Sequence, residues 1–177
     1  MTDIALLPSI AIIVATAARN AIGAAGSIPF RISGDMKRFR EVTMGRPIIM
    51  GRRTFESLPS GALPGRHNIV VSHRADYHPD GATVAPSLSE AIAIAAAGHP
   101  DEIMIIGGGE IYSQALGSTS RIYLTEVDAD YPDADTFFPE LDMAAWAVEE
   151  VSEPMTDPKS GLGYRFITLR RRRAPRG

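Results

Sequence analysis

Two short apolar stretches of the sequence run directly into positively charged and hydroxyl side chains. Gly51, Arg52, Arg53 and Thr54 follow Pro47–Met50, and Ser72, His73 and Arg74 close the stretch that begins at His67. Cations at the start of a helix oppose its dipole, and an anion bound between them would remove that conflict. Two such sites indicate more than one phosphate, as in a dinucleotide with an additional 2′-phosphate, and favour NADPH over NADH. Solvent exposure is the simpler explanation for any one of these side chains alone, His73 in particular.

A third apolar stretch ends in consecutive glycines, Gly107, Gly108 and Gly109, which are followed by Glu110, Ile111 and Tyr112. Glycines after a strand let a ligand approach the backbone closely, and free amides at a helix start suit a phosphate. The spacing is not GxGxxG, and the P-loop lysine is missing. A tight turn between a strand and a helix explains the glycines equally well.

Asp35 is the acidic residue in the first turn of a predicted helix, Ser33–Thr43, with Ser33 as the expected N-cap. A carboxylate at this place stabilises the helix dipole, which is the simpler interpretation. The alternative is that Asp35 points inward beside Met36 and Phe39. Burial would then raise the pKa of the carboxyl group and allow it to share a proton with a substrate.

Two connecting segments have compositions typical of ligand contacts. The segment Asn20–Arg31 is long, contains Gly23 and Gly26 and lacks periodicity, which predicts a mobile loop that covers a site. The turn Leu63–Arg66 presents Arg66, which could pair with a substrate carboxylate. An ordinary connection and a solvated arginine are the respective alternatives.

Strands and helices that alternate along the chain must position these residues. The strands are predicted at Ser9–Thr16, Pro47–Met50, His67–Ser72, Ala82–Ala85, Glu102–Ile106 and Arg121–Val127, followed by an antiparallel pair at Trp146–Val151 and Gly163–Arg170. The helices are predicted at Ser33–Thr43, Arg52–Leu58, Ser87–Ala97, which opens on a capping box, and Glu110–Leu116. The pattern predicts a single α/β domain over residues 1–177, with a mainly parallel, eight-stranded twisted sheet, an antiparallel C-terminal closing strand and about four helices. Ligands bind at the carboxyl ends of such strands.

Composition limits the classes of function. The chain of 177 residues has no cysteine, which excludes disulfides and thiolate metal sites, and no His, Asp or Glu cluster has metal-ligand spacing. No apolar run reaches the ~18 residues that span a membrane, and the lead-in of residues 1–8 does not resemble a signal peptide. We therefore expect a cytoplasmic monomer without a metal. The last eight residues contain five arginines; we expect a frayed, solvated tail over residues 170–177 and no nucleic-acid partner.

The sequence resembles the bacterial dihydrofolate reductases from Ser9 to about Arg171. The resemblance rests on the order and spacing of many short motifs, none decisive alone. They are Ile22–Gly23, Pro29–Phe30, the acid in Ser33–Phe39, Arg46–Leu58, Leu63–Ser72, Glu102–Tyr112, Tyr123–Asp130 and Asp135–Pro139.

The resemblance implies a role for each matching residue. Asp35 matches the acid that hydrogen-bonds the pterin, and Thr125 matches the threonine that supports it. Ile28 and Phe30 match the tip and end of the lid. The pterin and aminobenzoyl rings would contact Ile13, Met36, Phe39, Leu58, Leu63 and Ile106, and Arg66 would hold the glutamate carboxylate. NADPH would contact Ala15, Ile22, Gly23, Ser27, Gly51, Arg52, Arg53, Thr54, Ser72, His73, Arg74, Gly107, Gly108, Gly109, Glu110, Ile111 and Tyr112.

The implied activity is NADPH-dependent reduction of dihydrofolate to tetrahydrofolate for one-carbon metabolism, with dihydrofolate and antifolate-like small molecules as ligands. The sequence departs from the common pattern at Phe30, where tryptophan is usual, because phenylalanine cannot donate a hydrogen bond to water. Ile28 replaces a frequent methionine. The alternatives are a reductase of ribosylated pyrimidines with the same fold and a non-catalytic NADPH-binding module; Asp35, Phe39 and Arg66 argue against the second.

Overall fold

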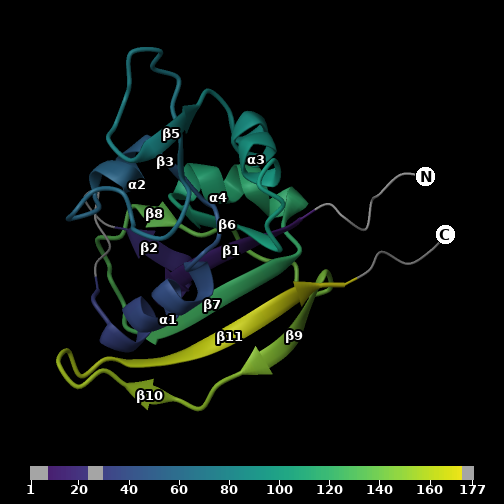
Figure 1. The fold of residues 1–177 in the computed structure, drawn as a ribbon. Coiled ribbons are helices and arrows are strands. Elements are labelled where there is room, and N and C mark those ends of the chain that lie inside the picture. The colour runs from purple at the N-terminus through teal and green to yellow at the C-terminus, as the bar shows by residue number, and fades with distance from the viewer. Residues whose placement is uncertain (1–7, 24–29, 173–177) are drawn as a thin grey trace.

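The computed structural model describes residues 8–23 and 30–172. A twisted sheet in the order β10-β11-β7-β1-β6-β3-β4-β5 forms its centre, with β9 also paired to β11 (Figure 1). The parallel strands are β1 (Ser9–Thr16), β3 (Ile48–Gly51), β4 (Asn68–Val71), β5 (Ala82–Ala85), β6 (Glu102–Gly107) and β7 (Arg121–Asp128). The predicted α/β class is confirmed.

Both faces of the sheet are covered, which is why the central strands are almost continuously apolar. Along β1, Ile12 and Val14 face a cluster that includes α3 (Leu88–Ala96) and α4 (Gly109–Ala115). Ala11 and Ile13 face the other cluster, which receives side chains from α1 (Ser33–Thr43) and α2 (Arg52–Glu56). Ser87 caps α3 as predicted, accepting a hydrogen bond from the Glu90 amide at 3.1 Å.

The C-terminal strands close the sheet in antiparallel fashion. β11 (Gly163–Arg171) pairs with β7 on one side and with β9 (Trp146–Val151) and β10 (Met155–Thr156) on the other. The described sheet therefore has one strand more than expected, because β10 is only two residues long and leaves no pattern in the sequence. None of the described helices is long and apolar enough to span a membrane.

The prediction of a frayed tail from residue 170 needs a correction. Arg170 and Arg171 belong to β11. The Arg171 side chain donates hydrogen bonds to the carbonyl oxygens of Thr119 (2.8 Å) and Leu116 (2.5 Å), and its guanidinium lies 4.4 Å from the centre of the Trp146 ring. Backbone carbonyls and an aromatic face hold this cation, which no local pattern reveals. The rest of the predicted tail lies outside the described residues.

The segment expected to be an irregular loop begins with regular structure. A 3-10 turn at Ala18–Asn20 leads into β2 (Ala21–Gly23), which pairs with β8 (Thr136–Phe137). The backbone groups of β2 therefore have partners 113 or more positions away, beyond the reach of local sequence patterns. Residues 24–29 lie outside the described ranges.

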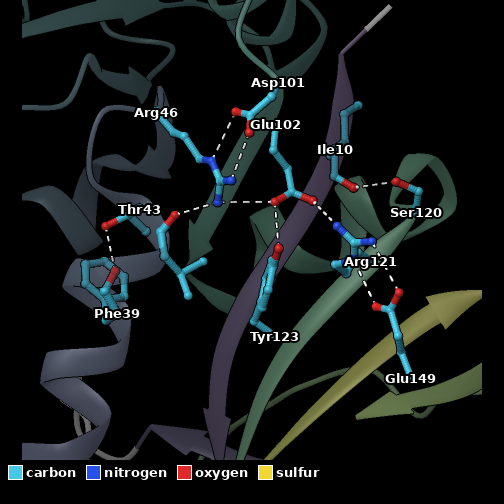
Figure 2. A network of polar contacts seen from close by, with 11 residues as sticks. Ile10, Phe39, Thr43, Arg46, Asp101, Glu102, Ser120, Arg121, Tyr123 and Glu149 are labelled. Atoms are coloured by element: carbon cyan, nitrogen blue, oxygen red, sulfur yellow. Dashed lines mark hydrogen bonds and ion pairs between the residues drawn. The ribbon is translucent and has the colours of Figure 1, made fainter. Parts of the chain in front are cut away.

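A polar network fastens the C-terminal end of α1 to the amino ends of the strands (Figure 2). Arg46 donates to the Val42 carbonyl at 2.8 Å and forms a bidentate pair with Asp101. Glu102, which is 3% exposed, lies between Arg46 (3.4 Å) and Arg121 (3.2 Å). Its second partner on β7 is the Tyr123 hydroxyl, which donates to it at 2.8 Å. A buried carboxylate is stable there because every neighbour donates to it.

Glu102→Gln should lower the free energy of unfolding by about 2 kcal/mol, because the neutral amide replaces three charge-assisted contacts. Glu149→Gln is the matched control, since Glu149 binds the same Arg121 from an exposed position; its cost should stay below about 1 kcal/mol. Urea unfolding of both variants makes the comparison. Equal losses of unfolding free energy in the two variants would mean that the buried ion pairs of Glu102 stabilise the fold no more than the exposed pair of Glu149.

Candidate active site

The carboxyl ends of the parallel strands bring the predicted site residues to one edge of the sheet. β3 lies between β6 and β4, with Met50 opposite both Gly107 and Val70. The residues that follow these strands, Arg52 and Ser72 among them, are therefore neighbours in space although they are far apart in the sequence. This arrangement agrees with the position expected for a ligand in a parallel sheet.

Asp35 reaches this edge from α1 and does not cap its own helix. Thr125 of β7, which is 1% exposed, donates its hydroxyl hydrogen to Asp35 Oδ1 at 2.6 Å. Burial raises the pKa of the Asp35 carboxyl above its ordinary value, while the bond from Thr125 and the positive charge of Arg38 act against the rise. The inward orientation that was the alternative to capping is the one observed.

The cap of α1 comes from the other end of the chain. The expected N-cap, Ser33, is the first residue of the helix, and the residue before it, Ile32, has no side-chain cap. Asp157 Oδ1 instead accepts from both the amide and the hydroxyl of Ser33 at 3.0 Å, and its Oδ2 accepts twice from Ser160 at 2.8 Å. Sequence reasoning missed Asp157 because its partner lies 124 positions away.

Tyr164 packs against the same turn of α1. A Cβ atom placed on Gly34 would lie 2.1 Å from the Tyr164 hydroxyl oxygen, so only glycine fits between Ser33 and Asp35 without a displacement of this ring. Asp157 and Tyr164 lie in the segment that spans β10 and the start of β11. This segment fixes the turn that carries Asp35.

Most of the apolar residues predicted to contact the pterin and aminobenzoyl rings lie close together. One cluster contains five of the six residues: Ile13, Phe39, Leu58, Leu63 and Ile106. Met36 lies outside it and is 56% exposed. Arg66 lies beside this wall, where its guanidinium donates to the Thr43 hydroxyl at 3.1 Å and to the Pro64 carbonyl at 2.9 Å.

Side chains on the glycine segment would crowd the residues around it. A Cβ on Gly109 would lie 2.8 Å from Thr136 Cγ2, and one on Gly108 would lie 3.3 Å from Thr54 Oγ1. Gly107 has a φ of 130°, which favours glycine. Tyr112 is buried, and its hydroxyl lies 2.8 Å from the Ile13 carbonyl and 2.9 Å from the Ile106 carbonyl, so it links the middle of β1 to the carboxyl end of β6.

The predicted phosphate contacts are not equivalent. Arg52 already has an acidic partner, Glu56, at 2.5 Å, which was not expected. Arg53 and Arg74 are exposed and have no acidic partner among the described residues. Ser72 is buried and accepts from the Arg74 amide at 3.2 Å, while His73 is exposed. Two guanidinium groups at adjacent strand ends therefore remain available for anions.

The remaining predicted residues surround the start of the covering segment. Ala15 and the buried Phe30 belong to a third apolar cluster, where the Phe30 ring lies 6.1 Å from the ring of Tyr131. Ile22 and Gly23 lie on β2. Ile28 and Ser27 fall outside the described residues. Within the described ranges, no group of His, Asp and Glu side chains could hold a metal ion.

Comparisons with known proteins identify the family. The family model for dihydrofolate reductase matches residues 9–171. The chain belongs to the dihydrofolate reductase family. The enzymes of this family are NADP-dependent oxidoreductases, so both the enzyme class and the cofactor predicted from the sequence agree with it.

Individual relatives match over nearly their whole length. Dihydrofolate reductase type 3 of Salmonella typhimurium is 42% identical over 93% of this chain and 99% of its own. The dihydrofolate reductase of Mycobacterium tuberculosis is 40% identical over 92% of this chain and 98% of its own. The structure of the Enterococcus faecalis dihydrofolate reductase complexed with NADP(H) and RAB-propyl superposes with a TM-score of 0.85 at 29% identity, covering 93% of this chain and 97% of that one.

Asp157→Ala should reduce stability in a pH-dependent way. Hydrogen bonds from Ser160 and Ser33 hold the pKa of Asp157 well below its ordinary value. Its carboxylate therefore contributes fully above the unfolded-state pKa, about 3.9, and loses this contribution as the pH falls further. Thermal unfolding of the variant and the wild type should differ most at neutral pH and converge in acid. The exposed Asp133 provides the control, Asp133→Ala; a gap for Asp157→Ala that is constant with pH would contradict the assignment.

Proposed function

We propose that this chain reduces 7,8-dihydrofolate to 5,6,7,8-tetrahydrofolate with NADPH, and that the pterin binds against Asp35. The observation that carries the proposal is the carboxyl group of Asp35, held by Thr125 at the edge of an apolar wall. An apolar wall suits the flat faces of a pterin, and one carboxyl group suits the row of donors along its edge. The cation Arg66 at the far end of the wall suits the carboxylate tail of folates.

The residues at the neighbouring strand ends fit a pyridine dinucleotide. The glycine segment offers a backbone that no Cβ shields, and Arg53 and Arg74 offer charge without an acidic partner in the described part of the chain. We propose that Gly107, Gly108, Thr54 and Ser72, together with these two arginines, hold the phosphates. When bound, NADPH supplies the hydride that is added to C6 of the substrate.

Asp35 then has two tasks in the proposed mechanism. Its carboxyl group binds the pterin amino group and ring nitrogen, and its negative charge favours protonation of N5, with a water molecule delivering the proton. One carboxyl group cannot serve as both acid and base at separate atoms, so the proton comes from solvent. Thr125 fixes the orientation of the carboxyl group, and Phe30 contributes apolar bulk without a donor. One chain carries all of these residues, and we propose that the monomer is the working unit.

A spectrophotometric assay tests the proposed reaction. We expect NADPH oxidation that depends on dihydrofolate and is much slower with NADH. Asp35→Asn should lower kcat/KM about 100-fold or more near neutral pH, because the charge that favours N5 protonation is lost. NADPH binding, followed by fluorescence, should remain. Full activity of this variant would show that another group serves the pterin, and no oxidation by the wild type would refute the reaction itself.

Arg53→Gln should weaken NADPH binding about 10-fold, because a charge-assisted hydrogen bond to phosphate contributes on the order of 1.5 kcal/mol. Titration calorimetry measures the Kd. Arg170→Gln, an exposed arginine on β11, should leave it unchanged. An unaltered Kd for Arg53→Gln would remove Arg53 from the cofactor site.

A further inference from the structure

Arg38 lies three residues after Asp35, on the same face of α1. Its guanidinium crosses to strand β7, where Nη1 donates to the Leu124 carbonyl at 3.0 Å. The next residue along that strand, Thr125, holds Asp35. Consecutive residues of one strand therefore bind the side chains of Asp35 and Arg38.

The surface that receives both side chains spans two strands. The antiparallel register places Phe166 opposite Thr125 and Thr168 opposite Tyr123. Because alternate residues of a strand point to the same face, these four form one patch. Arg38 Nη2 donates to Thr168 Oγ1 at 3.2 Å, and the guanidinium lies 4.4 Å from the Phe166 ring centre and 5.7 Å from that of Tyr123.

These contacts fix the position of a positive charge without neutralising it. Two neutral acceptors and two aromatic faces hold the guanidinium, and the described residues contain no direct ion pair between Arg38 and Asp35. The titratable groups that face Arg38 from other elements are Glu150 of β9 and Tyr123 of β7. Tyr112 of α4 is a further titratable neighbour of Asp35, and its buried hydroxyl stays neutral because burial raises its pKa. The Tyr164 hydroxyl lies beside the same turn, next to Gly34.

We propose that Arg38 is a positioning residue for Asp35: it holds the acid-bearing turn of α1 against β7 and keeps a fixed positive charge beside the carboxyl group. The catalytic consequence rests on the proposed function, in which Asp35 binds the pterin. The electrostatic part does not, because it concerns the titration of Asp35 in the protein alone.

The direction of the effect follows from the two opposing influences on Asp35. Burial favours the neutral carboxyl group, whereas the charge of Arg38 favours the carboxylate. Removing the charge should therefore raise the pKa of Asp35 further. The neutral form would then persist to higher pH, and any pH dependence of turnover that follows Asp35 would move in the same direction.

The test compares Arg38→Gln with Arg38→Lys, which keeps the charge. The carboxyl ¹³C signal of Asp35, assigned with Asp35→Asn, is titrated without ligands. Arg38→Gln should raise the midpoint by roughly half a unit to one unit, the size expected for a charge several ångströms away at partial exposure. Arg38→Lys should stay close to the wild type, as should Arg165→Gln, which removes an exposed arginine of β11 paired with Glu126.

A second measurement needs no variant of Arg38. In the wild type, the side-chain ¹⁵N signals of Arg38 should shift with the midpoint of Asp35, and this shift should vanish in Asp35→Asn. An unchanged Asp35 midpoint in folded Arg38→Gln, or Arg38 signals that do not respond to Asp35, would overturn the proposal. A raised midpoint in a protein that never oxidises NADPH with dihydrofolate would retain the electrostatic role and reject the function instead.

Discussion

The hydrogen bond between Thr125 and Asp35 is the constraint on which the site depends, because it joins a helix to a strand 90 residues later in the chain. A single bond of this kind could not hold a helix in place. The structure adds supports along the length of α1: Asp157 binds its first residue, Arg38 docks its middle on β7 and β11, and Arg46 binds its last turn to the sheet. The carboxyl group is therefore placed by a helix fixed near both ends, which gives it the fixed orientation that the proposed pterin-binding role requires.

The two edges of the sheet use charge in opposite ways. At the amino ends of the strands, Glu102 is enclosed by cationic and hydroxyl donors, so its charge is satisfied within the protein. At the carboxyl ends, Arg53 and Arg74 have no acidic partner in the described ranges. Unpaired cations repel one another and favour an anion from solution. The stability supplied by the Glu102 network at the amino ends helps the fold to tolerate the unpaired cations at the carboxyl ends. The direction of the parallel strands determines which edge of the sheet carries which group.

A structural feature could be predicted from the sequence where neighbouring residues determine it, and was missed where distant contacts do. Strand β1 and helix α1 have the predicted bounds because apolar runs and helical spacing are properties of neighbouring residues. Asp157, the short strand β10 and the anchoring of Arg171 on Trp146 were missed, since each depends on contacts across the chain. In the site, five of the six residues predicted for the apolar wall lie in one cluster, whereas the sixth, Met36, lies outside it and is exposed. Arg52 was expected to be available for phosphate, but Glu56 one turn later already binds it, and that spacing was visible in the sequence.

Burial alone would not suit the role proposed for Asp35. A fully desolvated carboxyl group would keep its proton and lose the charge on which the proposed mechanism depends, whereas a fully exposed one would lose its fixed orientation. Thr125 stabilises the carboxylate by a short bond, and Arg38 does so by its charge from a distance. An arginine paired directly with Asp35 would compete with the substrate for the same oxygen atoms. By binding Arg38 to a carbonyl, a hydroxyl and an aromatic ring instead, strands β7 and β11 keep its guanidinium from pairing directly with the carboxyl group.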